Sequence, residues 1–131
     1  MAVKEYALEE LTAEQLLAET TEPDTPDSVK ERLRERIVEM HRPLAMEIAR
    51  RYRYRGEPIE DLLQAAYVGL MKAVNGFDPT LGHAFRGYAV VTMTGEVKRH
   101  FRDRTWAIRL RQVMLVAVAH DAVDRLDKAI A

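Results

Sequence analysis

The chain lacks cysteine altogether, and this is the first of several absences that narrow its function. Without a thiol it can form neither a disulfide framework nor a thiolate metal site, so its composition is typical of a reduced, intracellular protein. Its longest apolar run, 113–119, is far too short to span a bilayer, and residues 1–5 lack the basic and apolar pattern of a secretion signal. We therefore expect a cytoplasmic protein of one ordinary domain, since 131 residues can bury a helical core.

Catalytic motifs are equally scarce. The six glycines fall at turns, at helix ends or singly, so no glycine-rich phosphate loop is present, and no serine or cysteine nucleophile constellation can be found. The histidines are scattered, and only Glu96 with His100 has the one-turn spacing that could share a metal, although a surface helix pair is favoured. These absences predict a protein that is not an enzyme and that holds no cofactor or metal.

Charge is sorted along the chain, although the formal net charge is only -1. Residues 1–28 carry eight acids against one lysine, residues 29–56 carry nine bases against four acids, and residues 86–111 carry seven bases against two acids. The basic segments can form a nucleic-acid surface, or their charges can alternate on solvated helix faces. Position along the helices has to decide between these interpretations.

The first part of the chain predicts a short helix, a linker and then a longer helix. Thr12 and Gln15 form a capping box for a helix over 12–18, and the proline- and acid-rich stretch 20–27 has the composition of a mobile linker. We place the folded domain after it, with Ser28 and Glu31 as a second capping box. One buried stripe follows at helical spacing: Leu33, Ile37, Met40, Leu44 and Ile48.

Proline and glycine mark the next boundaries. Pro43 either kinks this helix or splits it in two, with His41-Arg42 as a short joint. Gly56 can end the segment in a left-handed conformation, and Pro58 suits the opening turn of a helix over 59–75 that Gly76 stops. The buried stripe of that helix consists of Ile59, Leu63, Ala66, Leu70, Ala73 or Val74, and Phe77.

The last part predicts a turn and two helices. Residues 78–82 have turn chemistry, and a helix over 84–102 follows, although its β-branched middle, 89–94, could form a strand by propensity. An amphipathic helix over 112–130 carries apolar residues on one face. The predicted fold class is all-α: a compact bundle of about four helices with a mobile acidic N-terminal segment.

Several sequence motifs occur along the chain in the order that is typical of a known family. The chain resembles region 2 of bacterial RNA polymerase sigma factors over roughly 33–108, and its later motif is similar to the stress and sporulation branch. The residues that carry the resemblance are Ile59-Glu60-Asp61-Leu62-Leu63-Gln64, then Gly69-Leu70-Met71-Lys72-Ala73-Val74, then Phe77-Asp78-Pro79 with Gly82, Phe85, Tyr88 and Ala89, and finally Gly95–Asp103 with Thr105-Trp106.

The resemblance implies that core RNA polymerase is a partner. In such factors the second helix docks on a coiled coil of the clamp in the largest subunit. The matching residues are Asp61, Gln64, Tyr67 and Met71. A tyrosine and a methionine off the buried stripe suit a contact surface, whereas Asp61 can equally be an acid of the first turn that the helix dipole stabilises.

The resemblance also implies binding to promoter DNA. The family uses aromatic and basic residues to capture bases flipped from the non-template strand of the minus-ten element. The matching DNA-binding residues are Phe85, Arg86, Tyr88, Lys98, Arg99, Arg102, Trp106 and Arg109. Rings can stack on flipped bases and cations can contact phosphates. Alternatively, Phe85 and Tyr88 are core residues and Trp106 locks two helices together.

Several positions depart from the family pattern. Ala65 replaces a frequent glutamate, Val91-Thr92 replaces the tryptophan pair of housekeeping factors, and Gly95 and Lys98 replace residues that read the minus-ten duplex. A different promoter sequence is therefore expected. The family continues through a proline-arginine step into two further domains, whereas Arg111-Gln112 stands here and the sequence stops at Ala131, so a fragment, a truncated chain and a natural region-2-only protein all stay open.

The sequence therefore predicts a transcription initiation module that binds the polymerase clamp and melts the minus-ten element. The alternative is an interaction module that titrates an anti-sigma factor or occupies the clamp. The chain is expected to consist of an acidic segment and linker, 1–28, a region 2 helical domain, 29–111, and a C-terminal amphipathic helix, 112–131, at the start of a truncated or missing region 3.

Overall fold

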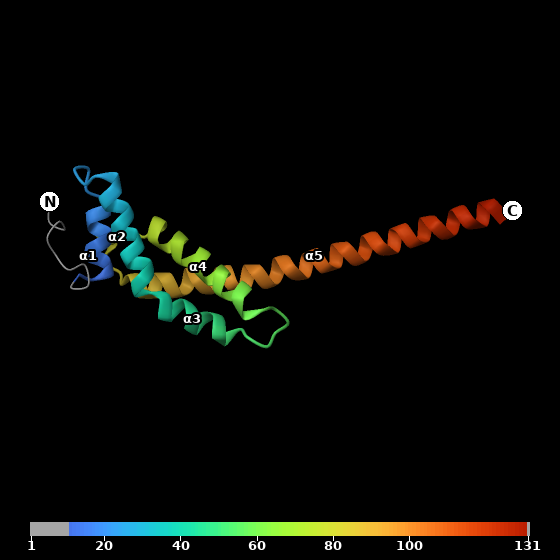
Figure 1. The fold of residues 1–131 in the computed structure, drawn as a ribbon, viewed down its shortest axis with the longest axis horizontal. Coiled ribbons are helices and arrows are strands. Elements are labelled where there is room, and N and C mark those ends of the chain that lie inside the picture. Colours follow the sequence, from blue (N-terminus) through green and yellow to red (C-terminus); the bar gives the residue numbers. More distant parts are fainter. Residues whose placement is uncertain (1–10, 131) are drawn as a thin grey trace. The chain divides into compact units, whose positions relative to one another are not determined.

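The computed structural model describes residues 11–130, and this part of the chain contains helices and no strands. The elements follow in the order α1 (Ala13–Thr20), α2 (Asp27–Met40), α3 (Arg42–Arg51), α4 (Ile59–Gly76), the 3-10 helix η2 (Pro79–Leu81) and α5 (Phe85–Ile130) (Figure 1). The all-α prediction is confirmed. No helix among the described residues combines the length and the apolar character needed to cross a membrane.

The chain divides into two units, Met1–Lys98 and Arg99–Ala131, and the boundary falls within α5. The first unit contains the core, to which every helix from α1 to α5 contributes. In the second unit, every described side chain from Arg102 to Ile130 is exposed. The largest fully buried side chains are Phe85, Leu16, Leu17, Leu33, Ile37, Ile48, Leu62, Leu70, Met93 and Val97.

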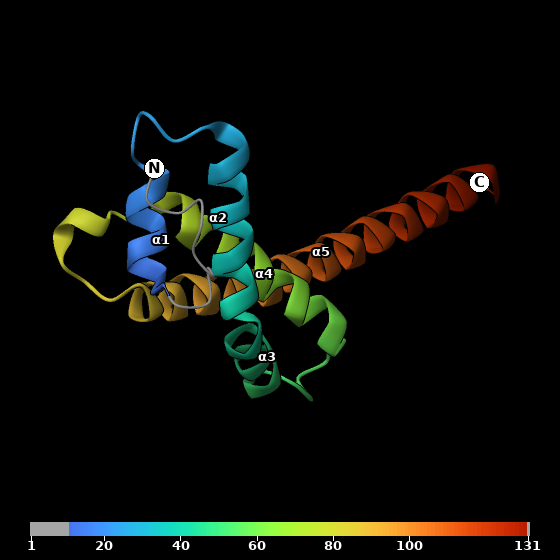
Figure 2. The same ribbon diagram turned by 60° about the vertical axis from the view of Figure 1, so that its left-hand side comes forward.

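Helix α1 is more closely integrated into the bundle than its acidic surroundings indicate. The predicted capping box is confirmed, since Gln15 N donates to Thr12 Oγ1 at 3.2 Å and Thr12 N donates to Gln15 Oε1 at 2.8 Å. Helix α1 lies beside α2 (Figure 2), and Leu16 and Leu17 are buried. The core therefore begins before residue 28, where the sequence placed the start of the folded domain.

The second predicted capping box is wrong. Helix α2 begins at Asp27 with Pro26 as its N-cap, and no side chain makes a capping hydrogen bond there. Ser28 already lies in the first turn, so its hydroxyl cannot take the N-cap position. At Pro43 the structure supports a split into two helices, because α2 ends at Met40 and α3 begins at Arg42 with proline in its first turn.

Helix α4 matches the predicted helix to within a residue, and the turn after it is also confirmed. Asp78 caps η2 by accepting from Thr80 N at 2.9 Å, and Gly82 has a φ of 76°, as a left-handed turn residue should. The two predicted C-terminal helices, however, form one helix, α5. The segment 103–111 contains neither glycine nor proline, so nothing in it interrupts the helix. The β-branched stretch 89–94 is helical.

Candidate functional site

One face of α4 carries a ridge of side chains that are not packed in the core. Asp61, Gln64, Val68 and Met71 are separated by three, four and three residues, so they share one side of the helix, and we call them the docking ridge. Val68 is 47% exposed and Met71 is 44% exposed, whereas Leu62, Ala66 and Leu70 on the opposite side are buried. Helix α4 therefore packs on the bundle by one face and offers an apolar and polar strip on the other.

The structure brings together three of the four predicted polymerase-binding residues and adds one that the sequence did not single out. Val68 stands between Gln64 and Met71, one helical turn from each. The signal was available, because an apolar residue outside the buried stripe and within a row of contact candidates indicates a surface role. Asp61 is half-buried in the first turn of α4, where it also complements the helix dipole.

Tyr67 lies at the edge of the docking ridge and is half-buried. It interacts with the guanidinium of Arg42 at the start of α3. The pKa of Arg42 is raised above its ordinary value. The largest cause is its hydrogen bond to Glu39 at 3.0 Å, and the second is its interaction with the Tyr67 hydroxyl. Tyr67 therefore joins α4 to α3 and stays less accessible than Gln64 or Met71.

A close helix crossing places the start of α5 against α4. Gly69 is buried, and a Cβ atom at this position would lie 2.5 Å from the Met93 Cα. Lys72 of α4 and Glu96 of α5 form an ion pair across the same crossing. On α5 the buried residues Phe85, Ala89, Met93 and Val97 recur every four positions, so one stripe of this first part packs in the core and the residues between are half-buried or exposed.

An apolar hollow of about 490 Å³ lies where α4, η2 and α5 meet, and we call it the Tyr88 hollow. Tyr88 is 40% exposed in it and packs against Phe77 with ring centroids 5.6 Å apart. Among the predicted DNA-binding residues, only Tyr88 lines this hollow. The complete lining consists of Gly76, Phe77, Asp78, Leu81, His83, Ala84, Gly87, Tyr88 and Val91.

Two features of the Tyr88 hollow were not predicted as parts of a site. Leu81 and Val91 are 64% and 73% exposed, so its rim is apolar and accessible. The Asp78 carboxylate has a pKa below its ordinary value, first because the Thr80 hydroxyl donates to it at 2.6 Å and then because Thr80 N also donates. The hollow therefore combines a ring, an apolar rim and a charged hydrogen-bond acceptor.

Phe85 does not belong to this surface, which corrects its assignment as a DNA-binding residue. Its side chain is 0% exposed and makes edge contacts with His41 and Phe77 at centroid distances of 5.0 and 5.3 Å. Its backbone N–H donates to Glu14 Oε1 of α1 at 3.2 Å. A ring enclosed in this way cannot stack on a base, so the alternative interpretation as a core residue holds.

Arg86 and Lys98 are exposed at the two ends of the α5 segment in the first unit. Arg86 also pairs with Glu47 of α3 at 3.9 Å, and its side chain remains 65% exposed. Both cations are therefore accessible, and Arg86 additionally connects α5 with α3.

The second unit carries the remaining predicted DNA-binding residues on one line of α5. Arg99, Arg102, Trp106 and Arg109 are separated by three, four and three residues, and we call them the basic ridge. Trp106 is 64% exposed, and a shallow hollow of about 290 Å³ is lined by Phe101, Arg102, Thr105, Trp106 and Arg109. Arg99 also pairs with Asp103 at 3.6 Å. The exposed indole favours a surface role over the alternative of a lock between helices.

The described chain is thus of the all-α class, with an exposed strip on one helix, an aromatic hollow and a line of cations. Comparison with known proteins agrees with this class. Residues 37–107, more than half of the chain, match the family described as Sigma-70 region 2. The chain therefore belongs to this family.

Individual relatives are sigma factors of the stress and sporulation branch. RNA polymerase sigma factor SigF of Mycobacterium tuberculosis is 49% identical over 80 residues, which cover 61% of this chain and 31% of the relative. RNA polymerase sigma-B factor of Bacillus anthracis is 38% identical over 76 residues, 58% of this chain and 30% of the relative. RNA polymerase sigma-G factor of Bacillus subtilis is 37% identical over 70 residues, 53% of this chain and 27% of the relative. The chain thus matches less than a third of each of these relatives.

Proposed function

We propose that this chain is a transcription initiation module that binds the clamp coiled coil of core RNA polymerase through the docking ridge. The observation that carries this proposal is the exposure of Val68 and Met71 on a helix whose opposite face is buried. Exposed apolar side chains beside polar residues such as Gln64 are typical of partner contacts, because they gain free energy only when a partner covers them. The relatives are named as RNA polymerase sigma factors, which supports the polymerase as that partner.

The second part of the proposal is capture of a base from the non-template strand of the minus-ten element in the Tyr88 hollow. A flipped base needs a flat apolar partner, and Tyr88 supplies one beside Phe77. Asp78 is charged and can accept a hydrogen bond from a base amino group, while a volume of about 490 Å³ accommodates a base. Independently of the hollow, the basic ridge contacts phosphates of single-stranded DNA without reading its sequence.

Tyr88→Leu is expected to weaken binding of a fluorescent single-stranded minus-ten oligonucleotide by about tenfold, because stacking on a ring contributes about 1–3 kcal/mol per base. Leucine retains apolar volume against Phe77, so the thermal melting curve should change little. Val91→Trp should have the opposite effect on affinity, because it adds a ring at a rim position that is 73% exposed. Fluorescence anisotropy at a fixed salt concentration measures both changes.

The proposal of base capture would be wrong if both variants bound the oligonucleotide like the unchanged chain. If oligonucleotide binding is absent while the chain still binds the clamp or an anti-sigma protein, the alternative interaction module replaces the initiation module. Loss of binding together with a lowered melting temperature would show that Tyr88 acts through the core, and this too would contradict its role as a base contact.

A further inference from the structure

A cationic and aromatic segment joins α3 to α4, outside the surfaces described above. Residues 50–56 contain four arginines, two tyrosines and one glycine, without an acid among them. The segment begins in the last turn of α3, and with Glu57 and Pro58 it reaches the start of α4. We call residues 50–58 the arginine–tyrosine loop.

Tyr54 lies in this loop with its ring in solvent. Its φ of 65° lies in the left-handed region, which side chains other than glycine, asparagine and aspartate seldom adopt, and it is the one non-glycine residue with positive φ among the described residues. Its exposed fraction is 92%, larger than that of any other exposed large hydrophobic residue in the described part of the chain. Strained conformations of this kind concentrate at binding sites, where the surrounding structure holds them.

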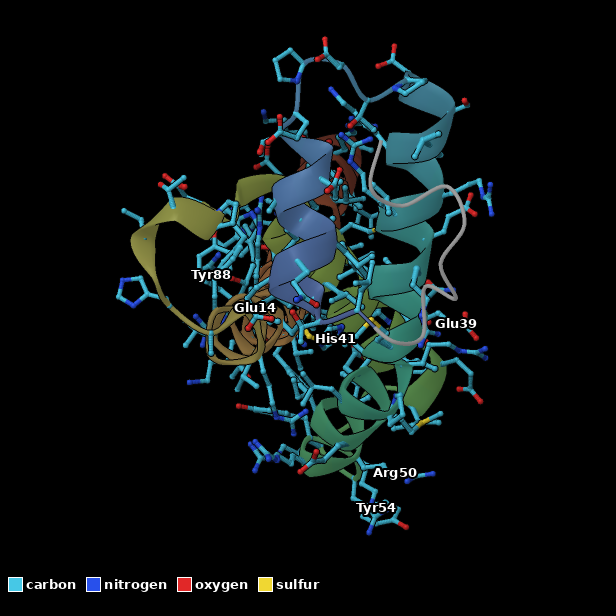
Figure 3. The ribbon with its side chains drawn as sticks, turned by 90° about the vertical axis from the view of Figure 1, so that its left-hand side faces the viewer. Glu14, Glu39, His41, Arg50, Tyr54 and Tyr88 are labelled. Atoms are coloured by element: carbon cyan, nitrogen blue, oxygen red, sulfur yellow. The ribbon has the colours of Figure 1, made fainter. Side chains whose placement is uncertain are left out.

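The arginines of the loop are arranged around its rings. The Arg53 guanidinium lies 5.3 Å from the centroid of the Tyr54 ring, and that of Arg55 lies 5.0 Å from the centroid of Tyr52. Arg50 and Tyr54 lie together at the end of the bundle that is away from Tyr88 (Figure 3). A hollow of about 540 Å³ is lined by Arg50, Arg53, Tyr54, Gly56, Glu57, Pro58 and Ile59.

We propose that the arginine–tyrosine loop binds single-stranded nucleic acid, with the Tyr54 ring stacking on a base and with Arg50 and Arg53 contacting phosphates. Alternating flat rings and cations match a strand that alternates flat bases and anions, and arginine adds its own stacking to that of the ring. An acidic peptide would satisfy the arginines but would leave the Tyr54 ring without a counterpart.

This inference goes beyond the proposed function, because it concerns a different place on the bundle. The loop precedes α4 and the Tyr88 hollow follows it, so the 18 residues of the helix separate them by roughly 27 Å at 1.5 Å per residue. A single strand that contacts both would follow α4 from one end to the other. Either contact can exist without the other, so each can be tested by its own variants.

The test titrates the full chain with a labelled oligothymidylate of about 12 nucleotides, within the usual site sizes of single-strand binders, and follows anisotropy over a range of salt concentrations. Tyr54→Asn removes the ring while keeping a residue that tolerates the left-handed conformation. Arg50→Gln combined with Arg53→Gln removes two cations. Arg32→Gln, at an exposed position of α2, is the control for loss of a cation outside the loop. We expect each loop variant to lose about five- to tenfold in affinity and the control to lose little.

Three outcomes would overturn the inference. In the first, both loop variants bind oligothymidylate like Arg32→Gln; if Tyr88→Leu still weakens binding, the proposed function stands and only the loop contact fails. In the second, the arginine variant weakens binding but Tyr54→Asn does not, so the loop is only a charged surface. In the third, poly-L-glutamate displaces oligothymidylate from the loop as well as unlabelled oligothymidylate does, so the partner is an acidic protein segment.

Discussion

Gly69→Ala is expected to lower the free energy of unfolding by about 1–3 kcal/mol or more, because it forces a side chain into a fully packed helix crossing. The new Cβ would lie 2.5 Å from the Met93 Cα and 3.0 Å from the Met93 N and the Thr92 O, all of them backbone atoms that no rotamer change can move. Helices α4 and α5 would have to separate. For a domain of this size the melting temperature should fall by about 4–8 °C per kcal/mol, measured by circular dichroism.

Gly95→Ala is the matched control, since Gly95 lies in α5 and no atom beyond its chain neighbours and the adjacent backbone of its own helix is within 4 Å of its hypothetical Cβ. Alanine in an open helical position should leave the melting temperature unchanged or raise it, because glycine costs a helix up to about 1 kcal/mol relative to alanine. Equal melting temperatures for the two alanine variants would show that the crossing at Gly69 is not as close as described.

Removing two cations from the basic ridge is expected to have the largest effect on nucleic-acid binding. Arg102→Gln combined with Arg109→Gln should lower the affinity for a single strand by at least about tenfold at low salt. It should also flatten the slope of log affinity against log salt by about 1.4, since each phosphate contact with a single strand contributes about 0.7. The variant keeps the exposed indole of Trp106, so the change reports the two cations alone.

Arg125→Gln provides the comparison for the basic ridge. Arg125 lies on the same helix, its side chain is 79% exposed, and it already pairs with Asp121. Its loss should leave both the affinity and the salt slope close to those of the unchanged chain. If the two-arginine variant keeps the original slope, the basic ridge does not contact phosphates, and the strand must use other cations.

The helices that the sequence predicted well are those whose boundaries depend on local chemistry. Pro58 and Gly76 bound α4, and Thr12 with Gln15 caps α1, because these residues act through their own backbone and nearest neighbours. Whether α1 joins the core depends instead on its contacts with α2 and on the hydrogen bond that Phe85 N, at the start of α5, donates to Glu14, and the local sequence of α1 determines neither of them. The sequence also predicted a break in the helix before residue 112. This prediction is wrong, because no residue there stops the helix and α5 continues.

The candidate site was harder to predict than the helix that carries it. Phe85 and Tyr88 are aromatic, lie one turn apart and fit the same apolar spacing, yet one is fully buried and the other 40% exposed. The difference arises from His41 of the α2–α3 joint and Phe77 after α4, which enclose Phe85. Periodicity within α5 carries no information about those neighbours. Val68 was not predicted as a contact because an apolar side chain in a helix is usually expected in the core, although its position on the docking ridge indicates a surface role.

The most direct test of the central claim is a calorimetric titration of the full chain with the isolated clamp coiled coil of the largest polymerase subunit. The docking ridge predicts saturable binding that Gln64→Ala combined with Met71→Ala weakens by about tenfold or more, as expected for truncated hot-spot residues. Both side chains are exposed, so the variant should have the melting temperature of the unchanged chain. The control Glu35→Ala, at an exposed position of α2, should bind the clamp as tightly as the unchanged chain does. Absent binding, or equal affinity for the ridge variant and the Glu35 control, would contradict docking through α4.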